Sequence, residues 1–231
     1  MSWSTTVLTL FPEMFPGPLG VSLIGKALEN KLWSLEVRDI REHGLGKHRT
    51  VDDTPAGGGP GMVMRADVAA AAIDAVERAS RPLIYLSPRG APLTQARVKA
   101  LTEGPGAVLL CGRFEGLDER VIEARAIEEI SLGDFVLAGG EVAAMALIEA
   151  AVRLIPGVLG DASSPADESF SHGLLEYPQF TRPQTFETRS IPEVLTKGNH
   201  KEIAKWRRAQ SEHLTRQRRP DLWTHYEKPK G

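Results

Sequence analysis

Three glycine-rich turns follow apolar stretches whose composition is typical of buried β-strands. The turns are Leu86–Gly90 (LSPRG), Cys111–Gly116 (CGRFEG) and Ser131–Glu141 (SLGDFVLAGGE). In parallel sheets, ligands bind at the carboxyl ends of the strands, where such turns gather. Glycines there would also let a flat ligand lie against bare backbone. Each turn alone could simply redirect the chain, but the three together predict one shared ligand site.

The second of these turns also concentrates charged side chains. Arg113 and Glu115 lie within the turn itself and are the better candidates for contacts with a ligand. Asp118, Glu119 and Arg120 fall at the start of the next expected helix, where the two carboxylates interact favourably with the helix dipole. We therefore expect the first two residues to serve a site and the other three to stabilise the helix.

Arg153 and an acidic pair, Asp167 and Glu168, are further candidates for chemistry. Arg153 ends an otherwise apolar helix, where it either stabilises the helix C-terminus or supplies a fixed positive charge to a site. The acidic pair lies in a polar, Ser-rich stretch at 160–173. A carboxylate on a flexible segment can close over a substrate, although acidic residues are also common in linkers.

The stretch Pro55–Met62 (PAGGGPGM) is the densest cluster of glycine and proline in the chain. It is no Walker A loop, because no Lys-Ser or Lys-Thr pair follows its last glycine. Nor is it a dinucleotide-binding turn, because Pro60 interrupts the required spacing. Two interpretations stay open: a tight connector, or backbone amides that approach a phosphate or carboxylate.

The sequence contains no recognisable motif for a transition metal or a serine nucleophile. Its six histidines form no HxH or HExxH pattern, and no GxSxG elbow occurs. Cys111, the single cysteine, ends an apolar stretch and is expected to be a packing residue. One cysteine also rules out an internal disulfide and is typical of a protein from a reducing compartment.

The elements that would position these residues alternate between strand and helix. Strands are expected at 5–11, 34–40, 82–87, 107–112 and 127–133, and helices at 20–33, 66–79, 94–103, 117–125 and 141–155. This alternation predicts an α/β domain with a mostly parallel sheet. The stretch 41–64 has no clean period, and we expect a long functional loop there.

Charge is distributed unevenly along the 231 residues, despite a net charge of −2. Residues 182–231 hold 12 basic and 6 acidic side chains, whereas the rest holds 16 basic and 24 acidic. A basic, mainly helical tail indicates an anionic partner, nucleic acid first. A solvated helical face without a partner is the alternative. No signal peptide or membrane span is apparent, so we expect a soluble cytoplasmic protein.

Several motifs, taken in order, resemble one known family. They are LTLFPEMF, VDDTPAGGGPGM, IYLSPRG, CGRFEGLDERVIE, SLGDFVLAGGE, RLIPGVLG, ESFSHGLLEYPQFTRP and LTKGNHKEIAKWRR. The family is the bacterial tRNA (guanine-N1)-methyltransferases, TrmD, of the SPOUT class. The resemblance runs from Leu8 to about Arg208, nearly the whole chain.

The resemblance implies an α/β fold whose mostly parallel sheet contains a deep trefoil knot, followed by a small, mainly helical C-terminal domain. It assigns 1–159 to a catalytic domain that binds S-adenosylmethionine, 160–173 to a flexible linker and 174–231 to a basic tRNA-binding domain. It also implies a homodimer with active sites at the interface. Mg²⁺ is reported to benefit the family, although no ligand set for it is recognisable here.

The same resemblance carries residue roles over to this chain. The residues matched to the cofactor site, where S-adenosylhomocysteine would be the product, are Tyr85, Leu86, Ser87, Pro88, Gly112, Glu115, Leu132, Gly133, Asp134, Phe135, Val136, Leu137, Gly139 and Gly140. The residues expected to contact the tRNA substrate are Gly58, Gly59, Arg113 and Ser169.

The chemistry of guanine methylation suggests roles for Arg153 and for the acidic pair Asp167 and Glu168. Guanine N1 carries a proton, which a positioned carboxylate can remove as general base. Negative charge then grows on O6, where the guanidinium of Arg153, matched by the resemblance, would stabilise it. The family places an aspartate immediately before SF, but this chain has Glu168 there and Asp167 one position earlier. Either residue is therefore a candidate for the base.

A second departure from the family is Ala143, where a proline is usual. The helix start thereby loses a preset φ angle, which bears on the rigidity of the cofactor pocket. Two other functions stay open beside guanine methylation. One is a SPOUT methyltransferase that modifies another RNA nucleotide, such as a ribose 2′-hydroxyl. The other is a non-catalytic RNA-binding protein with the same fold.

Overall fold

The structure, a computed structural model, describes residues 2–160 and 168–227. The chain divides into two compact units, Met1–Gly160 and Asp161–Gly231. We call them the N-terminal unit and the C-terminal unit and describe each by itself. Asp167, one of the two candidate bases, lies outside the described residues.

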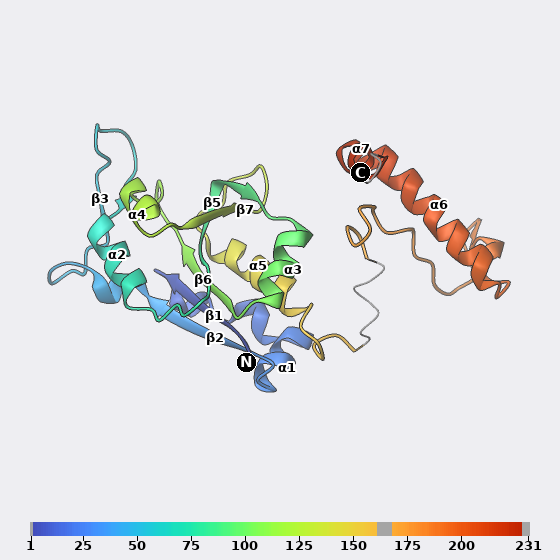
Figure 1. The fold of residues 1–231 in the computed structure, drawn as a ribbon, viewed down its shortest axis with the longest axis horizontal. Helices are drawn as coiled ribbons and strands as arrows, with labels where there is room; N and C mark the ends of the chain where they lie inside the picture. The colour runs from blue at the N-terminus through green and yellow to red at the C-terminus, as the bar shows by residue number, and fades with distance from the viewer. Residues whose placement is uncertain (1, 161–167, 228–231) are drawn as a thin grey trace. The chain divides into compact units, whose positions relative to one another are not determined.

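A five-stranded sheet forms the centre of the N-terminal unit (Figure 1). Its strands are β1 (Trp3–Thr9), β2 (Trp33–Asp39), β5 (Leu83–Pro92), β6 (Gly106–Cys111) and β7 (Glu128–Ser131). Every neighbouring pair is parallel, in the order β2-β1-β6-β5-β7. The mostly parallel α/β sheet predicted from the sequence is confirmed, and β5, β6 and β7 are adjacent in it.

Helices cover both faces of this sheet. They are α1 (Ser22–Glu29), α2 (Ala66–Asp74), α3 (Gln95–Glu103), α4 (Glu119–Ala124) and α5 (Glu141–Val152). Successive strand residues point to opposite faces, so Val7 and Leu109 join a core with α1, α3 and α5, while Leu8 and Leu110 join a second core with α2 and α4. A parallel sheet buried on both faces explains why its strands are continuous apolar runs in the sequence.

Several boundaries differ from the sequence-based expectation: the helix expected at 66–79 ends at Asp74, and the strand expected at 82–87 runs to Pro92. The helix expected to reach Trp33 ends at Glu29, and Trp33 begins β2 with its side chain fully buried. Lys31 adopts a left-handed φ of +58°, which terminates the helix, and Trp33 Nε1 donates to the carbonyl of Ile24 at 3.0 Å. Thr94 caps the start of α3, since its Oγ1 accepts from Arg97 N at 3.2 Å.

The stretch 41–64, expected to be a loop, contains a little regular structure. A 3₁₀ turn, η3 (Ile40–His43), opens it, and two short strands, β3 (Asp52–Asp53) and β4 (Val63–Met64), pair antiparallel. The glycine-rich stretch therefore forms the tip of a hairpin whose base is fixed by Val51 and Met64 in the core. Periodicity could not detect strands of two residues.

The C-terminal unit is mainly helical, as the sequence predicted. It comprises a small hairpin of β8 (Thr185–Phe186) and β9 (Arg189–Ser190), the 3₁₀ turn η5 (Glu193–Leu195), α6 (His200–Arg218) and α7 (Pro220–Glu227). Asn199 caps α6 by accepting from Glu202 N at 3.4 Å. The buried Thr215 accepts from Leu175 N at 2.8 Å and so attaches the preceding segment to α6. Within the described part of the chain, the helices are too short or too polar to traverse a bilayer.

Candidate active site

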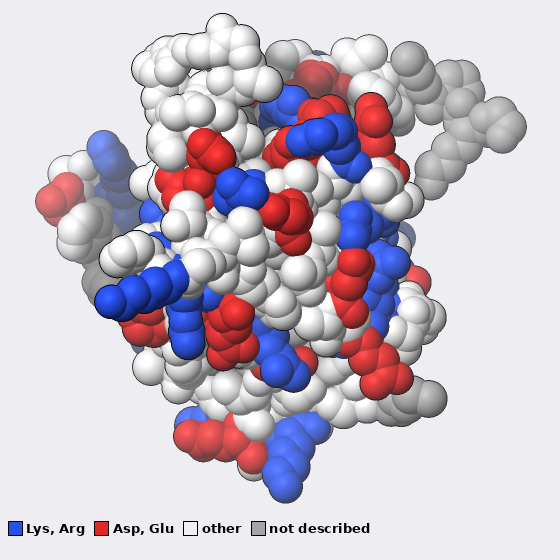
Figure 2. All heavy atoms as spheres, turned by 90° about the vertical axis from the view of Figure 1, so that its left-hand side faces the viewer, with Lys and Arg blue, Asp and Glu red and all other residues white. Residues whose placement is uncertain are grey.

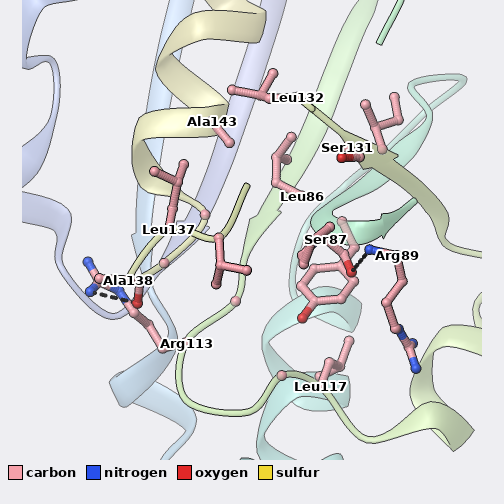
Figure 3. A pocket seen from close by; sticks show the side chains of 18 of the residues that line it. Leu86, Ser87, Arg89, Arg113, Leu117, Ser131, Leu132, Leu137, Ala138 and Ala143 are labelled. Carbon is pink, nitrogen blue, oxygen red and sulfur yellow. Dashed lines mark hydrogen bonds between the residues drawn. The ribbon is translucent and has the colours of Figure 1, made fainter. Parts of the chain in front are cut away.

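Three segments enclose one cavity: Leu86–Gly90, which lies within β5, and the turns that follow β6 and β7 (Figure 3). Its volume is about 320 Å³. All residues predicted to hold the cofactor line it except Asp134. The adjacency of β5, β6 and β7 explains this convergence, because neighbouring parallel strands deliver their following turns to the same edge.

The first wall of the cavity comes from an irregularity in β5. The pairing of β5 with β7 shifts register between Leu86 and Ala91, so the intervening residues leave the ladder. Ser87 Oγ fixes this bulge by accepting from Arg89 N at 3.2 Å. On the facing strand, Ser131 Oγ accepts from Gly133 N at 3.2 Å. Both serines are buried, so hydroxyl groups organise the backbone on two sides of the cavity.

Two buried groups at the cavity have an altered pKa: Tyr85, which lines it, and Cys111, which directly precedes the lining residue Gly112. Burial raises the pKa of the Tyr85 phenol above its usual value and raises the pKa of the Cys111 thiol well above its usual range. Both groups are therefore neutral at physiological pH. Cys111 has the packing environment expected from its position at the end of an apolar strand, fully buried in the core.

Arg113, from the second turn, joins several segments beside the cavity. Its Nε donates to Glu141 Oε1 at 3.2 Å, and its Nη2 lies 3.0 Å from Glu141 Oε2, close enough for an ion pair although not aligned as a hydrogen bond. Its Nη1 donates to the Ala138 carbonyl at 3.3 Å, a contact visible in Figure 3. The guanidinium also stacks over the Phe11 ring at 4.2 Å.

The glycine-rich hairpin tip is tied to the cavity at its second half. Met64 N donates to the Gly116 carbonyl and Glu115 N donates to the Met62 carbonyl, each at 2.9 Å. Gly61 has a φ of +84°, and a β-carbon there would collide with the carboxylate of Glu115, a cavity residue. The glycines at 57–59 also have positive φ, but a β-carbon on them would meet nothing within 4 Å. Chain conformation, rather than internal packing, therefore requires those three.

A second hollow of about 660 Å³ lies between this hairpin and helices α2 and α4. Ion pairs surround it: Arg65 with Asp53 at 2.9 Å and Asp67 at 2.8 Å, and Arg120 with Asp118 at 2.7 Å. The latter pair confirms the salt-bridged helix start expected from the sequence. Figure 2 shows the side of the molecule that carries α2 and α4, with basic and acidic side chains interspersed. This face thus has mixed charge, and the arginines that line the hollow, Arg65, Arg120 and Arg125, are each paired with an aspartate.

Arg153, Gly58 and Gly59, which belong to the N-terminal unit, are not among the residues that line the cavity. Arg153 is the C-cap of α5, where its backbone N donates to Glu149 O at 3.1 Å. Glu168 and Ser169 belong to the C-terminal unit. There, Ser169 Oγ accepts from Glu176 N at 3.0 Å, and the Glu168 carbonyl accepts from Ser171 N at 3.2 Å. Gly58 and Gly59 are exposed at the hairpin tip.

Several cavity residues were not singled out from the sequence. They are Arg89, Phe114, Leu117, Ile130, Ser131 and Ala138. Most lie inside the three turns already identified. Their position between predicted site residues was therefore the sequence feature that could have indicated them. Ala143, singled out only as a departure from the family, also lines the cavity. Among the residues that the structure describes, no group of three or more His, Cys, Asp or Glu side chains could hold a metal ion.

These features define a class: an α/β protein that presents a ligand cavity at the carboxyl ends of adjacent parallel strands. Residues 3–225 match the family model described as tRNA (Guanine-1)-methyltransferase TrmD. The chain therefore belongs to the TrmD family of methyltransferases, as the sequence motifs predicted.

Curated relatives support the assignment over nearly the full chain. A tRNA (guanine-N(1)-)-methyltransferase of Rhodopseudomonas palustris (strain ATCC BAA-98 / CGA009) is 68% identical over 96% of this chain and 90% of its own length. One of Nitrobacter winogradskyi is 66% identical over 96% of this chain and 94% of its own. One of Chelativorans sp. (strain BNC1) is 62% identical over 100% of this chain and 99% of its own.

Proposed function

We propose that this protein transfers the methyl group of S-adenosylmethionine to N1 of the guanosine at position 37 of tRNA, the nucleotide 3′-adjacent to the anticodon. The observation that carries the proposal is the meeting of the three motif-bearing turns around one cavity in a member of the TrmD family. The relatives named above are tRNA (guanine-N(1)-)-methyltransferases, which supports the reaction and the substrate class.

The chemistry of the cavity lining fits a nucleoside cofactor. Leu86, Leu132 and Leu137 supply apolar surface for a flat base, and the lining glycines Gly112 and Gly140 have no side chain to fill the space beside it. Glu115 adds a carboxylate, which suits the positive charges of S-adenosylmethionine. The sulfonium of that cofactor supplies an already activated methyl group. The protein's task is then to hold donor and acceptor in line.

In the proposed mechanism, Glu168 or Asp167 accepts the proton of guanine N1, which frees the lone pair for attack on the methyl carbon. Arg153 stabilises the negative charge that grows on O6 and orients the base. Arg153 belongs to the N-terminal unit and Glu168 to the C-terminal unit.

Two exposed features are proposed to hold the RNA. The first is the hairpin tip, where the bare backbone of Gly58 and Gly59 is open to a partner. The second is the C-terminal unit, in which Arg207 and Arg216 lie over the rings of Tyr177 and Trp223. Arginine and aromatic groups side by side suit phosphates and unstacked bases. Ser169 is proposed to contact the same substrate next to the base.

We further propose that the protein is a cytoplasmic homodimer with active sites at the interface. Phe135, Val136 and Val142 near the cavity are exposed apolar side chains, with Val136 83% accessible, and a partner subunit would cover them. The trefoil knot is proposed on the path of the chain after β7. From that sheet edge it passes Gly112, whose carbonyl accepts from Gly140 N at 3.0 Å, and returns as α5 over β1 and β6.

The deciding experiment supplies methyl-labelled S-adenosylmethionine and a tRNA with guanosine at position 37, beside the same tRNA with adenosine there. We expect label only in the first, recovered as 1-methylguanosine after digestion. Label in a ribose 2′-O-methyl group would replace the proposal with the other SPOUT chemistry. Tight tRNA binding without any transfer, with and without Mg²⁺, would leave a binding protein and refute the enzyme.

A further inference from the structure

Glu141 is a charged side chain buried deep within the N-terminal unit, with 1% of its surface accessible. It is the first residue of α5, directly after the third turn. A carboxylate removed from water in this way is costly unless it is paired and hydrogen-bonded. Its Oε1 accepts from Thr9 Oγ1 at 2.7 Å and from Arg113 Nε at 3.2 Å. Both carboxylate oxygens thus lie against the Arg113 guanidinium, and Thr9 fixes their orientation.

Through Arg113, this buried carboxylate reaches the cavity wall. Arg113 lines the cavity and donates to the Ala138 carbonyl in the third turn at 3.3 Å. Its Nη2 lies 3.6 Å from Met14 Sδ, and its face covers the Phe11 ring. One guanidinium therefore joins the segment after β1, the turn after β6 and the turn after β7.

The third turn also packs tightly on Arg113. At Gly139, a β-carbon would overlap the Nε and Cδ atoms of Arg113. The hydrogen bond to the Ala138 carbonyl and the close packing at Gly139 both depend on Arg113 staying where Glu141 holds it. Gly139 and Ala138 both line the cavity. The shape of that wall therefore depends on the pairing of Arg113, which lines the cavity, with the buried Glu141.

We propose that Glu141 is a positioning residue for cofactor binding: with Thr9 it clamps Arg113 against the third turn and pre-forms the cavity wall. The inference rests on the proposed function only in taking S-adenosylmethionine as the ligand. Without the clamp, the cavity wall becomes ordered only when the ligand binds. The entropy lost in that ordering lowers the affinity of the protein for S-adenosylmethionine. Glu141 touches no reacting atom, so turnover at saturating cofactor changes little while KM for the cofactor rises.

The test uses the full chain in four forms: wild type, Glu141→Gln, Arg113→Met and the double variant. Glu149→Gln is the matched control, because Glu149 is an exposed glutamate on the same helix. Calorimetry gives the Kd of S-adenosylmethionine, steady-state methylation gives kcat and KM, and thermal unfolding gives Tm. We expect each single variant to weaken cofactor affinity by roughly tenfold or more, the scale of one lost charge-assisted hydrogen bond.

The double variant separates positioning from simple stability. Removing both charges relieves the unpaired buried group, so its Tm should recover towards wild type relative to Glu141→Gln. If Glu141 positions the wall, the weakened cofactor affinity persists in the double variant, because the contact to Ala138 is still missing. Recovery of affinity together with Tm would overturn the proposal, as would wild-type affinity in Glu141→Gln. Failure of the wild type itself to bind S-adenosylmethionine would instead refute the proposed cofactor.

Discussion

At the scale of single residues, the same residue type has different roles according to its neighbours. Arg120 and Arg113 lie in the same stretch of the sequence but have different environments: Arg120 is bound to Asp118 at an exposed helix start, whereas Arg113 is 19% exposed beside Glu141. Sequence reasoning selected Arg113 over Arg120 correctly as a cavity residue. It could not see Glu141 as its partner, because nothing in a sequence fixes a contact across 28 positions.

Arg153→Ala should abolish most methyl transfer without preventing cofactor binding. The substitution removes the positive charge proposed to stabilise O6, and loss of one such group lowers kcat by roughly 100-fold or more. Single-turnover methylation measures the rate, and calorimetry with S-adenosylmethionine measures binding. Arg153→Lys, which keeps the charge but not the paired donors, should retain part of the rate. Near-normal turnover in Arg153→Ala would show that its proposed role is wrong.

The general base can be assigned by comparing Glu168→Gln with Asp167→Asn. Each change keeps the shape of the side chain and removes its ability to accept a proton at neutral pH, so only the true base should cost turnover. Methylation rate and tRNA affinity are measured for both, with each variant serving as the control for the other. We expect Glu168→Gln to lose more, since Glu168 occupies the matching position before SF. Equal and small losses would mean that neither carboxylate is the base.

At the scale of elements, the strands and helices that carry the site were predictable to within a few residues, and the hairpin at 52–64 was not. Buried parallel strands are long apolar runs, so periodicity and composition detect them. The two-residue strands β3 and β4 leave no such pattern. These strands nevertheless position the glycine-rich tip, because β4 attaches it to the turn after β6 through Gly116 and Leu117.

That attachment predicts different effects for two glycines with similar backbone angles. Gly58 and Gly61 have φ of +80° and +84°, so alanine costs about 1–2 kcal/mol of backbone strain at either position. Only at Gly61 does the new β-carbon also displace the carboxylate of Glu115. We expect Gly61→Ala to weaken S-adenosylmethionine binding and Gly58→Ala to leave it unchanged, as measured by calorimetry. Equal weakening in both variants would argue that loop strain alone reaches the cavity.

At the scale of the whole molecule, the sequence predicted the α/β class and the basic helical tail, but the order of strands in the sheet lay beyond it. β1 pairs with β6, which lies more than 90 residues later in the chain. Such a pairing depends on how all the strands pack together, so local sequence patterns do not predict it. The convergence of the three turns was predictable, because the carboxyl ends of parallel strands lie at the same edge of a sheet. Which turns would be neighbours followed only from the order β6-β5-β7.

Several aspartates across both units are stabilised in their charged form by arginines, which sets how the molecule responds to acid. Hydrogen bonds from arginine lower the pKa of Asp67, Asp74 and Asp118 in the N-terminal unit, and Arg219 lowers that of Asp221 in the C-terminal unit to about 2. Each folded-state pKa is lower than the unfolded value of about 4. These carboxylates therefore make their full contribution to the free energy of unfolding above that pH.

Stability should therefore be constant through the neutral range and fall as pH drops from about 4 towards 2, where these carboxylates take up protons in the unfolded chain first. Urea unfolding at a series of pH values measures the midpoint. These pairs are largely exposed, so about 1 M salt should flatten the acid limb, since screening weakens charge pairs at the surface. Asp221→Asn should make the response of the C-terminal unit shallower, while Glu227→Gln, in the same helix, should not. A midpoint that stays unchanged across the acid range would show that the arginine pairs contribute nothing to folding.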